Sequence, residues 1–189
     1  AGEPAAVSGA PAVQPPAPAA QPLSLCDGMD GHLVATEAGS AFRLERRYPL
    51  DYLRGPLPLG WTLRLPASVW PLVGRVPPVF DPRKAVFVDT ETTGLAGGTG
   101  TYAFLVGLGF YRGDEFVVRQ YFLRDYPEED AMLSAIAADL APFTCLVSFN
   151  GKSFDWPLLE TRFRMARRRP PLSGAPHLDL LHPARRIWS

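Results

Sequence analysis

The chain has 189 residues, of which 47% are hydrophobic and 21 are proline, enough for one domain with an appended segment. Its formal net charge of zero excludes a uniformly basic or acidic protein but conceals two oppositely charged regions. Residues 114–139 contain seven acids and two arginines, whereas residues 152–189 contain eight bases and three acids. The basic region predicts an anionic partner, although its arginines are equally consistent with a solvated helix face.

Cysteine use and hydropathy indicate a cytoplasmic protein. Cys26 and Cys145 lie far apart, and no Cys or His spacing typical of a metal site occurs, so a reducing compartment is expected. The longest apolar run, residues 102–111, is about half the length that spans a bilayer. We therefore expect no membrane association. The sequence shows no secretory signal, but it begins with alanine, so that absence is weak evidence.

The N-terminal part divides into a tail and a connector. Residues 1–23 are rich in Ala, Pro and Gln and are predicted to be disordered. Residues 24–80 are predicted to form a hairpin, which begins at Gly31 and turns at "AGS", followed by a Pro-rich connector anchored by tryptophans. This segment either covers a sheet edge or docks a partner.

Residues 81–189 carry the pattern of an α/β domain. Three strands form a meander, and a helix, a strand, a second helix and a fifth strand follow. The predicted elements are strands 84–91, 101–111 and 115–123, helix 127–141, strand 143–149, helix 155–169 and strand 177–181. This order predicts a mixed sheet with helices packed against it.

The stretch "FVDTETTGL" places two carboxylates at the end of the first predicted strand of this domain. Asp89 and Glu91 are two residues apart, so they share one face of that strand. Like charges this close repel unless one is protonated or a cation joins them, and Mg²⁺ or Mn²⁺ suits oxygen ligands. The alternative is a turn in which Asp89 and Thr90 cap backbone groups.

A third carboxylate lies in "NGKSFD", between the fourth strand and the second helix. If the first and fourth strands are neighbours, Asp155 faces Asp89 and Glu91, and three such carboxylates can hold two metal ions. Alternatively, Asp155 is the N-cap of its helix, and Asn150 with Gly151 forms a turn.

These two motifs, in this order and layout, resemble the DEDD (DnaQ-like) 3′–5′ exonucleases of the ribonuclease-H-like fold. The phrases "YAFLVGLGFY", "FNGKSFDWPLLE" and "HLDLLHPARR" look most like the bacterial YprB-like subgroup. The resemblance covers residues 81–189. It implies a hydrolase that uses two divalent ions, Mg²⁺ or Mn²⁺, to cleave phosphodiester bonds at a single-stranded 3′ end of DNA or RNA.

The resemblance also implies roles for individual residues. Asp89 would bridge both ions, Glu91 would bind the ion that activates water, and Asp155 would hold the other ion. The residues implied in substrate binding are Thr92, Thr93 and Gly94 around the terminal nucleotide and Asn150 beside the site. Apart from the resemblance, its positive charge makes Lys152 a candidate for contact with phosphates.

The sequence departs from the family pattern after Asp155. The family has a fourth carboxylate in a later helix, in a His-x-x-x-Asp motif, and none follows Asp155. We therefore expect that the last helices of the fold are missing. Asp179 is interpreted as structural, and His177 and His182 as packing or hydrogen-bonding residues. The alternative functions are an inactive nucleic-acid-binding module of the same fold and a phosphodiesterase acting on small nucleotides.

Overall fold

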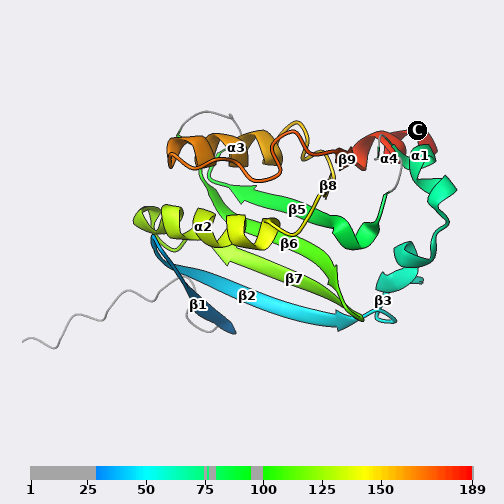
Figure 1. Cartoon of the computed structure of the whole chain (residues 1–189), viewed down its shortest axis with the longest axis horizontal. Helices are drawn as coiled ribbons and strands as arrows, with labels where there is room; N and C mark the ends of the chain where they lie inside the picture. The colour runs from blue at the N-terminus through cyan, green and yellow to red at the C-terminus, as the bar shows by residue number, and fades with distance from the viewer. Residues whose placement is uncertain (1–28, 75, 77–79, 95–99, 189) are drawn as a thin grey trace, which may run out of the picture.

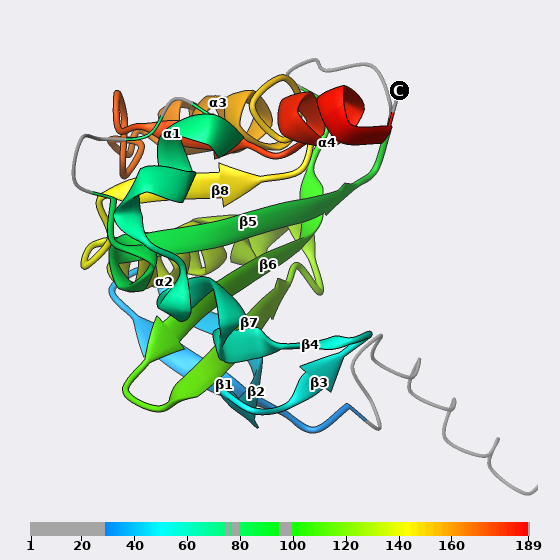
Figure 2. The same cartoon turned by 90° about the vertical axis from the view of Figure 1, so that its right-hand side faces the viewer.

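A computed structural model describes residues 29–74, 76, 80–94 and 100–188, so the predicted tail 1–23 lies outside the described residues. Seven strands form one mixed sheet in the order β1-β2-β7-β6-β5-β8-β9. Figure 1 and Figure 2 show that α2 and α3 cover one face of this sheet, whereas α1 lies on the opposite side. The predicted α/β ribonuclease-H-like architecture is confirmed.

The strands of the main sheet are β1 (Gly31–Thr36), β2 (Gly39–Pro49), β5 (Ala85–Thr92), β6 (Ala103–Arg112), β7 (Glu115–Phe122), β8 (Cys145–Ser148) and β9 (His177–Asp179). A separate two-stranded sheet contains β3 (Leu53–Arg54) and β4 (Leu57–Pro58). The α-helices are α1 (Trp70–Val73), α2 (Glu129–Leu140), α3 (Asp155–Met165) and α4 (Leu181–Trp188). Within the described ranges, no helix is both long and apolar enough to cross a bilayer.

The direction of pairing changes at β5, the strand that carries "DTE". β5 pairs antiparallel with β6 and parallel with β8, and β8 pairs parallel with β9. The carboxyl ends of β5, β8 and β9 therefore lie at the same edge of the sheet. On the other side, the predicted N-terminal hairpin extends the sheet because β2 pairs with β7.

The main core lies between the sheet and helices α2 and α3. Leu133 and Ile136 of α2 and Leu159 and Phe163 of α3 are fully buried, as their helical spacing predicts. They pack in one cluster with buried strand residues such as Val106. Because side chains alternate along a strand, the residues between these buried positions point to the opposite face of the sheet.

Helix ends and short elements differ from the sequence prediction. α3 ends at Met165 rather than at residue 169, and Arg167 has a φ of 57°, which a helix does not tolerate. β9 is only three residues long, and α4 follows it where no helix was predicted. The connector contains short 3₁₀ turns and the single turn of α1, although no helix was predicted there.

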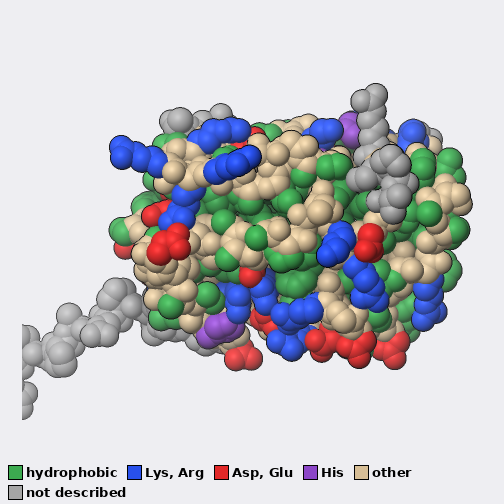
Figure 3. All heavy atoms as spheres, in the orientation of Figure 1, with side chains coloured by type: hydrophobic (Ala, Val, Ile, Leu, Met, Phe, Trp, Pro, Cys, Tyr) green, Lys and Arg blue, Asp and Glu red, His purple; other side chains and the backbone are tan. Residues whose placement is uncertain are grey.

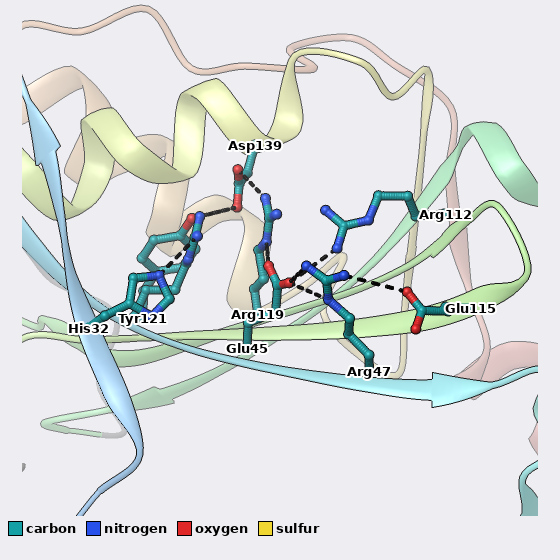
Figure 4. Close-up of polar contacts among 9 residues, drawn as sticks. His32, Glu45, Arg47, Arg112, Glu115, Arg119, Tyr121 and Asp139 are labelled. Atoms are coloured by element: carbon teal, nitrogen blue, oxygen red, sulfur yellow. Dashed lines mark hydrogen bonds and ion pairs between the residues drawn. The ribbon is translucent and has the colours of Figure 1, made fainter.

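A charged network ties the N-terminal hairpin to the rest of the sheet and to α2 (Figure 4). Arg119 of β7 donates to Glu45 of β2 at 2.7 Å and to Asp139 of α2 at 2.5 Å. The hydroxyl of Tyr121 also donates to Asp139. Burial alone would raise the pKa of Glu45, but Arg119 and two further arginines lower it to about 2. The network thus fixes three elements with charge-assisted bonds.

Candidate active site

Asp89 and Glu91 lie within β5 rather than in a turn. The strand continues to Thr92, and Asp89 pairs with Gly107 of β6. Val86 and Val88 are buried against the helices, whereas Asp89 and Glu91 are exposed. The alternation predicted from the sequence therefore directs both carboxylates away from the helix-covered face. The turn alternative does not describe this segment.

Asp155, the first residue of α3, contacts β5 from the helical side. The backbone N–H of Thr90 donates to Asp155 Oδ1 at 3.0 Å, and the Thr90 hydroxyl donates to the same oxygen. Phe154 occupies the N-cap position of α3, which has no side-chain capping bond. Asp155 is therefore tied to the residue between Asp89 and Glu91 and does not cap its own helix.

The three carboxylates interact electrostatically. Partial burial raises the pKa of Asp89, and the negative charges of Asp155 and Glu91 raise it further. A hard divalent cation bound near these negative charges would relieve the repulsion. Among the described residues, however, no three or more His, Cys, Asp or Glu side chains are arranged to hold a metal ion. The donor chemistry fits such an ion, but the described donors alone do not form a complete site.

Three of the predicted substrate-binding residues border one cavity with Glu91 and Asp155. This cavity of about 420 Å³ is lined by Thr90–Gly94, Thr101, Phe154, Asp155 and Leu158. Thr93 is fastened to Tyr102, because its hydroxyl accepts the Tyr102 N–H at 3.1 Å. Phe154 is 63% exposed beside the cavity, and its ring is available to a planar ligand.

Asn150 and Lys152 do not line this cavity. Asn150 has a φ of 64°, and its backbone N–H donates to Asp179 at 2.7 Å. The backbone N–H groups of Lys152 and Leu181 donate to the same carboxylate. Burial would raise the pKa of Asp179, but these three backbone bonds lower it. Asp179 thus orders the loop before α3 and the start of α4, as expected for a structural residue.

A second cavity, which the sequence reading missed, opens on the opposite face of β5 beside Asp89. It measures about 450 Å³ and includes Phe87, Gly107, Gly109 and Phe116 in its lining. A Cβ atom at Gly109 would lie 2.9 Å from the Phe116 ring, so the glycine leaves room for that ring. The sequence signal is "VGLG" in β6, whose two glycines fall on one face of the strand.

Ion pairs hold several of the arginines in and just after α3. Arg162 is buried against Glu129, and Arg168 pairs with Asp130 and Glu37. Figure 3 shows basic side chains gathered over the end of the molecule that carries α3. Arg162 and Arg168 are therefore engaged in ion pairs within the fold and do not form the solvated helix face given as the alternative.

The comparisons with known proteins agree with this fold. A family model described as the RNase H superfamily matches residues 86–188, which is more than half of the chain. The chain belongs to the RNase H superfamily. Members of this superfamily are usually nucleases or other hydrolases that typically use divalent metal ions.

A curated relative is similar to the same part of the chain. The protein described as "Uncharacterized protein YprB" from Bacillus subtilis (strain 168) is 44% identical over 103 residues. That region is 54% of this chain but 25% of the relative. The chain therefore spans about a quarter of the length of the relative it matches.

Proposed function

We propose that this chain carries the catalytic carboxylates of a metal-dependent 3′–5′ exonuclease, and that these are Asp89, Glu91 and Asp155. The proposal is carried by the contact between Asp155 and Thr90, two residues that are 65 positions apart in the chain. This contact brings a third carboxylate to the strand residue between the other two. A purely structural strand end gains nothing from such crowding, because it raises the free energy of the ionised carboxylates.

In the proposed reaction, water adds to the phosphorus of the 3′-terminal phosphodiester. The O3′ atom of the preceding nucleotide leaves and takes up a proton, which yields a nucleoside 5′-monophosphate and a strand shortened by one nucleotide. Two divalent ions, Mg²⁺ or Mn²⁺, would supply charge neutralisation and activation of the water when bound. Asp89, Glu91 and Asp155 would hold them, and Thr90 orients Asp155 through its N–H and hydroxyl groups.

The cavity beside Glu91 is the proposed site of the terminal nucleotide. Its volume of about 420 Å³ lies within the range of roughly 300–1,000 Å³ that is common for small-ligand sites. Thr92, Thr93 and Gly94 would contact the sugar, and the exposed ring of Phe154 would stack on the base. Stacking requires an unpaired base, so this arrangement favours a single-stranded 3′ end of DNA or RNA.

The test follows the shortening of single-stranded DNA and RNA labelled at the 5′ end, with Mg²⁺, with Mn²⁺ and with EDTA. We expect a metal-dependent ladder that shortens from the 3′ end and stops at a 3′-terminal phosphorothioate linkage. Asp89→Ala should reduce the rate by at least about 10²-fold and keep the circular dichroism spectrum of the parent. Asp114→Ala, which removes an exposed acid from the turn between β6 and β7, is the matched control. Equal cleavage by Asp89→Ala and the parent would refute the assignment.

A second candidate is a nucleic-acid-binding module without catalysis. It is supported by the lack, among the described residues, of three side chains arranged to hold a metal ion. Fluorescence anisotropy with the same labelled strands separates the two functions. Binding by both the parent and Asp89→Ala, without cleavage by either, would favour the binding module over the exonuclease.

A further inference from the structure

A basic cavity lies at the carboxyl ends of β8 and β9, between α1 and α4. Its volume is about 430 Å³, and four side chains with nitrogen donors line it: Lys152, His177, His182 and Arg186. Because β5, β8 and β9 are parallel neighbours, this cavity occupies the same edge of the sheet as Asp155. Neither histidine was expected to bind a ligand.

The charge balance of this basic cavity favours an anion. Among the described residues, Asp179 is the one carboxylate that lines it, and its two oxygens already accept three backbone N–H groups. The side chains of Lys152 and His182 are exposed, and the described part of the chain provides neither with a hydrogen-bond partner. These donors are therefore available to a ligand without the loss of an internal bond.

Arg186 shapes the cavity in addition to contributing charge. Its Nη2 atom donates to the backbone carbonyl of Leu72 at 3.0 Å and to that of Val73 at 3.2 Å. These bonds fasten α4 to α1, and Figure 1 shows the two helices next to each other. The wall of the cavity is thus held by a residue that lies outside the carboxylate site.

Ser148 connects the basic cavity to the carboxylate site. Its hydroxyl lies 2.7 Å from His177 Nε2. A Cβ atom at Gly151 would lie 2.7 Å from Ser148 Cβ and 2.9 Å from Asp155 Oδ2, so the turn at Gly151 brings Ser148 close to Asp155. Ser148 thus lies next to Asp155 and also next to His177, which lines the basic cavity.

We propose that the basic cavity binds a backbone phosphate of a nucleic-acid strand, internal to the phosphodiester that lies at the carboxylates. The inference rests on the proposed function, because it takes the same strand as the ligand. Lys152 supplies a positive charge to the phosphate, and His182 donates a hydrogen bond. Arg186 holds the wall against which the phosphate lies.

The experiment measures binding alone, in EDTA, so that cleavage does not enter the result. The probe is a 5′-fluorescein oligothymidylate of about 12 nucleotides, followed by fluorescence anisotropy over a series of salt concentrations. We expect Lys152→Ala to raise Kd about 3- to 10-fold and to reduce the slope of log Kd against log salt by about 0.7. His182→Ala should also raise Kd. Arg185→Ala removes a charge from the same helix outside the cavity and should leave both quantities near the parent values.

A scan of single methylphosphonate linkages locates the phosphate. Each linkage removes one charge, and the parent should lose affinity most at one position near the 3′ end. The affinity of Lys152→Ala should not change when the linkage is placed at that position. At every other position, a linkage should affect Lys152→Ala as much as it affects the parent. The proposal is overturned if Lys152→Ala and the parent give the same salt slope and scan profile, or if Arg185→Ala weakens binding as much as Lys152→Ala. A chain that shows these binding effects without cleavage would refute the exonuclease and retain the phosphate site.

Discussion

The carboxylate of Asp89 is held in surroundings that disfavour its ionised form. Partial burial, Asp155 and Glu91 all raise its pKa above that of the unfolded chain. Ionisation therefore destabilises the folded state relative to the unfolded state. This cost is absent below the unfolded pKa, develops as pH rises through the folded pKa, and is complete at neutral pH.

Replacement of Asp89 by asparagine should remove this cost. In EDTA at neutral pH, we expect Asp89→Asn to raise Tm by roughly 1–3 °C, because exposed charges contribute little in water. The gain should disappear as the pH falls below the unfolded pKa. Thermal unfolding followed by circular dichroism at several pH values measures it. A Tm below that of the parent at neutral pH would contradict the assigned repulsion.

Residue spacing predicted only part of this site. The two-residue period of a strand places Asp89 and Glu91 on one face, and this required no knowledge of the rest of the chain. The position of Asp155 depends on the pairing of β5 with β8. The sequence analysis did not predict this pairing and only stated what would follow from it. The role of Thr90 was missed, because its hydroxyl meets a carboxylate that is 65 residues away in the chain.

At the scale of elements, the charged network of Glu45, Arg119 and Asp139 joins β2, β7 and α2 (Figure 4). The Glu45 side chain is largely shielded from solvent, so its ion pairs are screened less than surface pairs. With a folded pKa of about 2 against an ordinary value of 4.5, ionised Glu45 stabilises the fold above about pH 4.5. That stabilisation declines as pH falls from 4.5 towards 2.

We therefore expect Glu45→Gln to lower the free energy of unfolding by about 1–3 kcal/mol at neutral pH. The difference from the parent should shrink in acid and vanish near pH 2. Urea denaturation at a series of pH values provides the measurement. Glu160→Gln, which breaks the exposed pair with Arg164 within α3, should cost no more than about 0.5 kcal/mol. If Glu45→Gln lowers the free energy of unfolding by the same amount at every pH, the ion pairs of Glu45 are excluded as the cause.

Element boundaries show where local patterns are insufficient. The buried spacing of α2 and the apolar run of β6 predicted these elements closely. The end of α3 was placed too late, because "ARRR" is compatible with a helix and only the left-handed backbone at Arg167 ends it. α4 was missed because it is short and contains Pro183, although proline is tolerated in the first turn of a helix.

At the scale of the whole molecule, one core joins the N-terminal hairpin, the meander and both large helices. Ala41 of β2, Leu133 of α2 and Phe163 of α3 belong to a single buried cluster. The hairpin thus contributes to the same core as the carboxylate-bearing strand. We expect these parts to unfold together, because none of them can bury its apolar face alone.

A core truncation tests this cooperativity. Leu133 is fully buried, so Leu133→Ala should cost about 2–5 kcal/mol and shift the far-ultraviolet and near-ultraviolet transitions by the same amount. Leu72→Ala is the control. Leu72 is 74% exposed, so this substitution should lower the free energy of unfolding only slightly. Two separate transitions in Leu133→Ala would show that the hairpin and the rest of the sheet unfold independently.

The bond between Thr90 and Asp155 also has a consequence for biosynthesis. Asp155 leaves the ribosome 65 residues after Thr90, a delay of several seconds at about 5–20 residues per second. During this interval β5, β6 and β7 have already been synthesised and can pair through short connections. Asp89 then lacks its negatively charged neighbour from α3. We expect the nascent chain to pair its antiparallel strands first. The repulsion between Asp155 and Asp89 then arises only after these strands have formed a stable sheet.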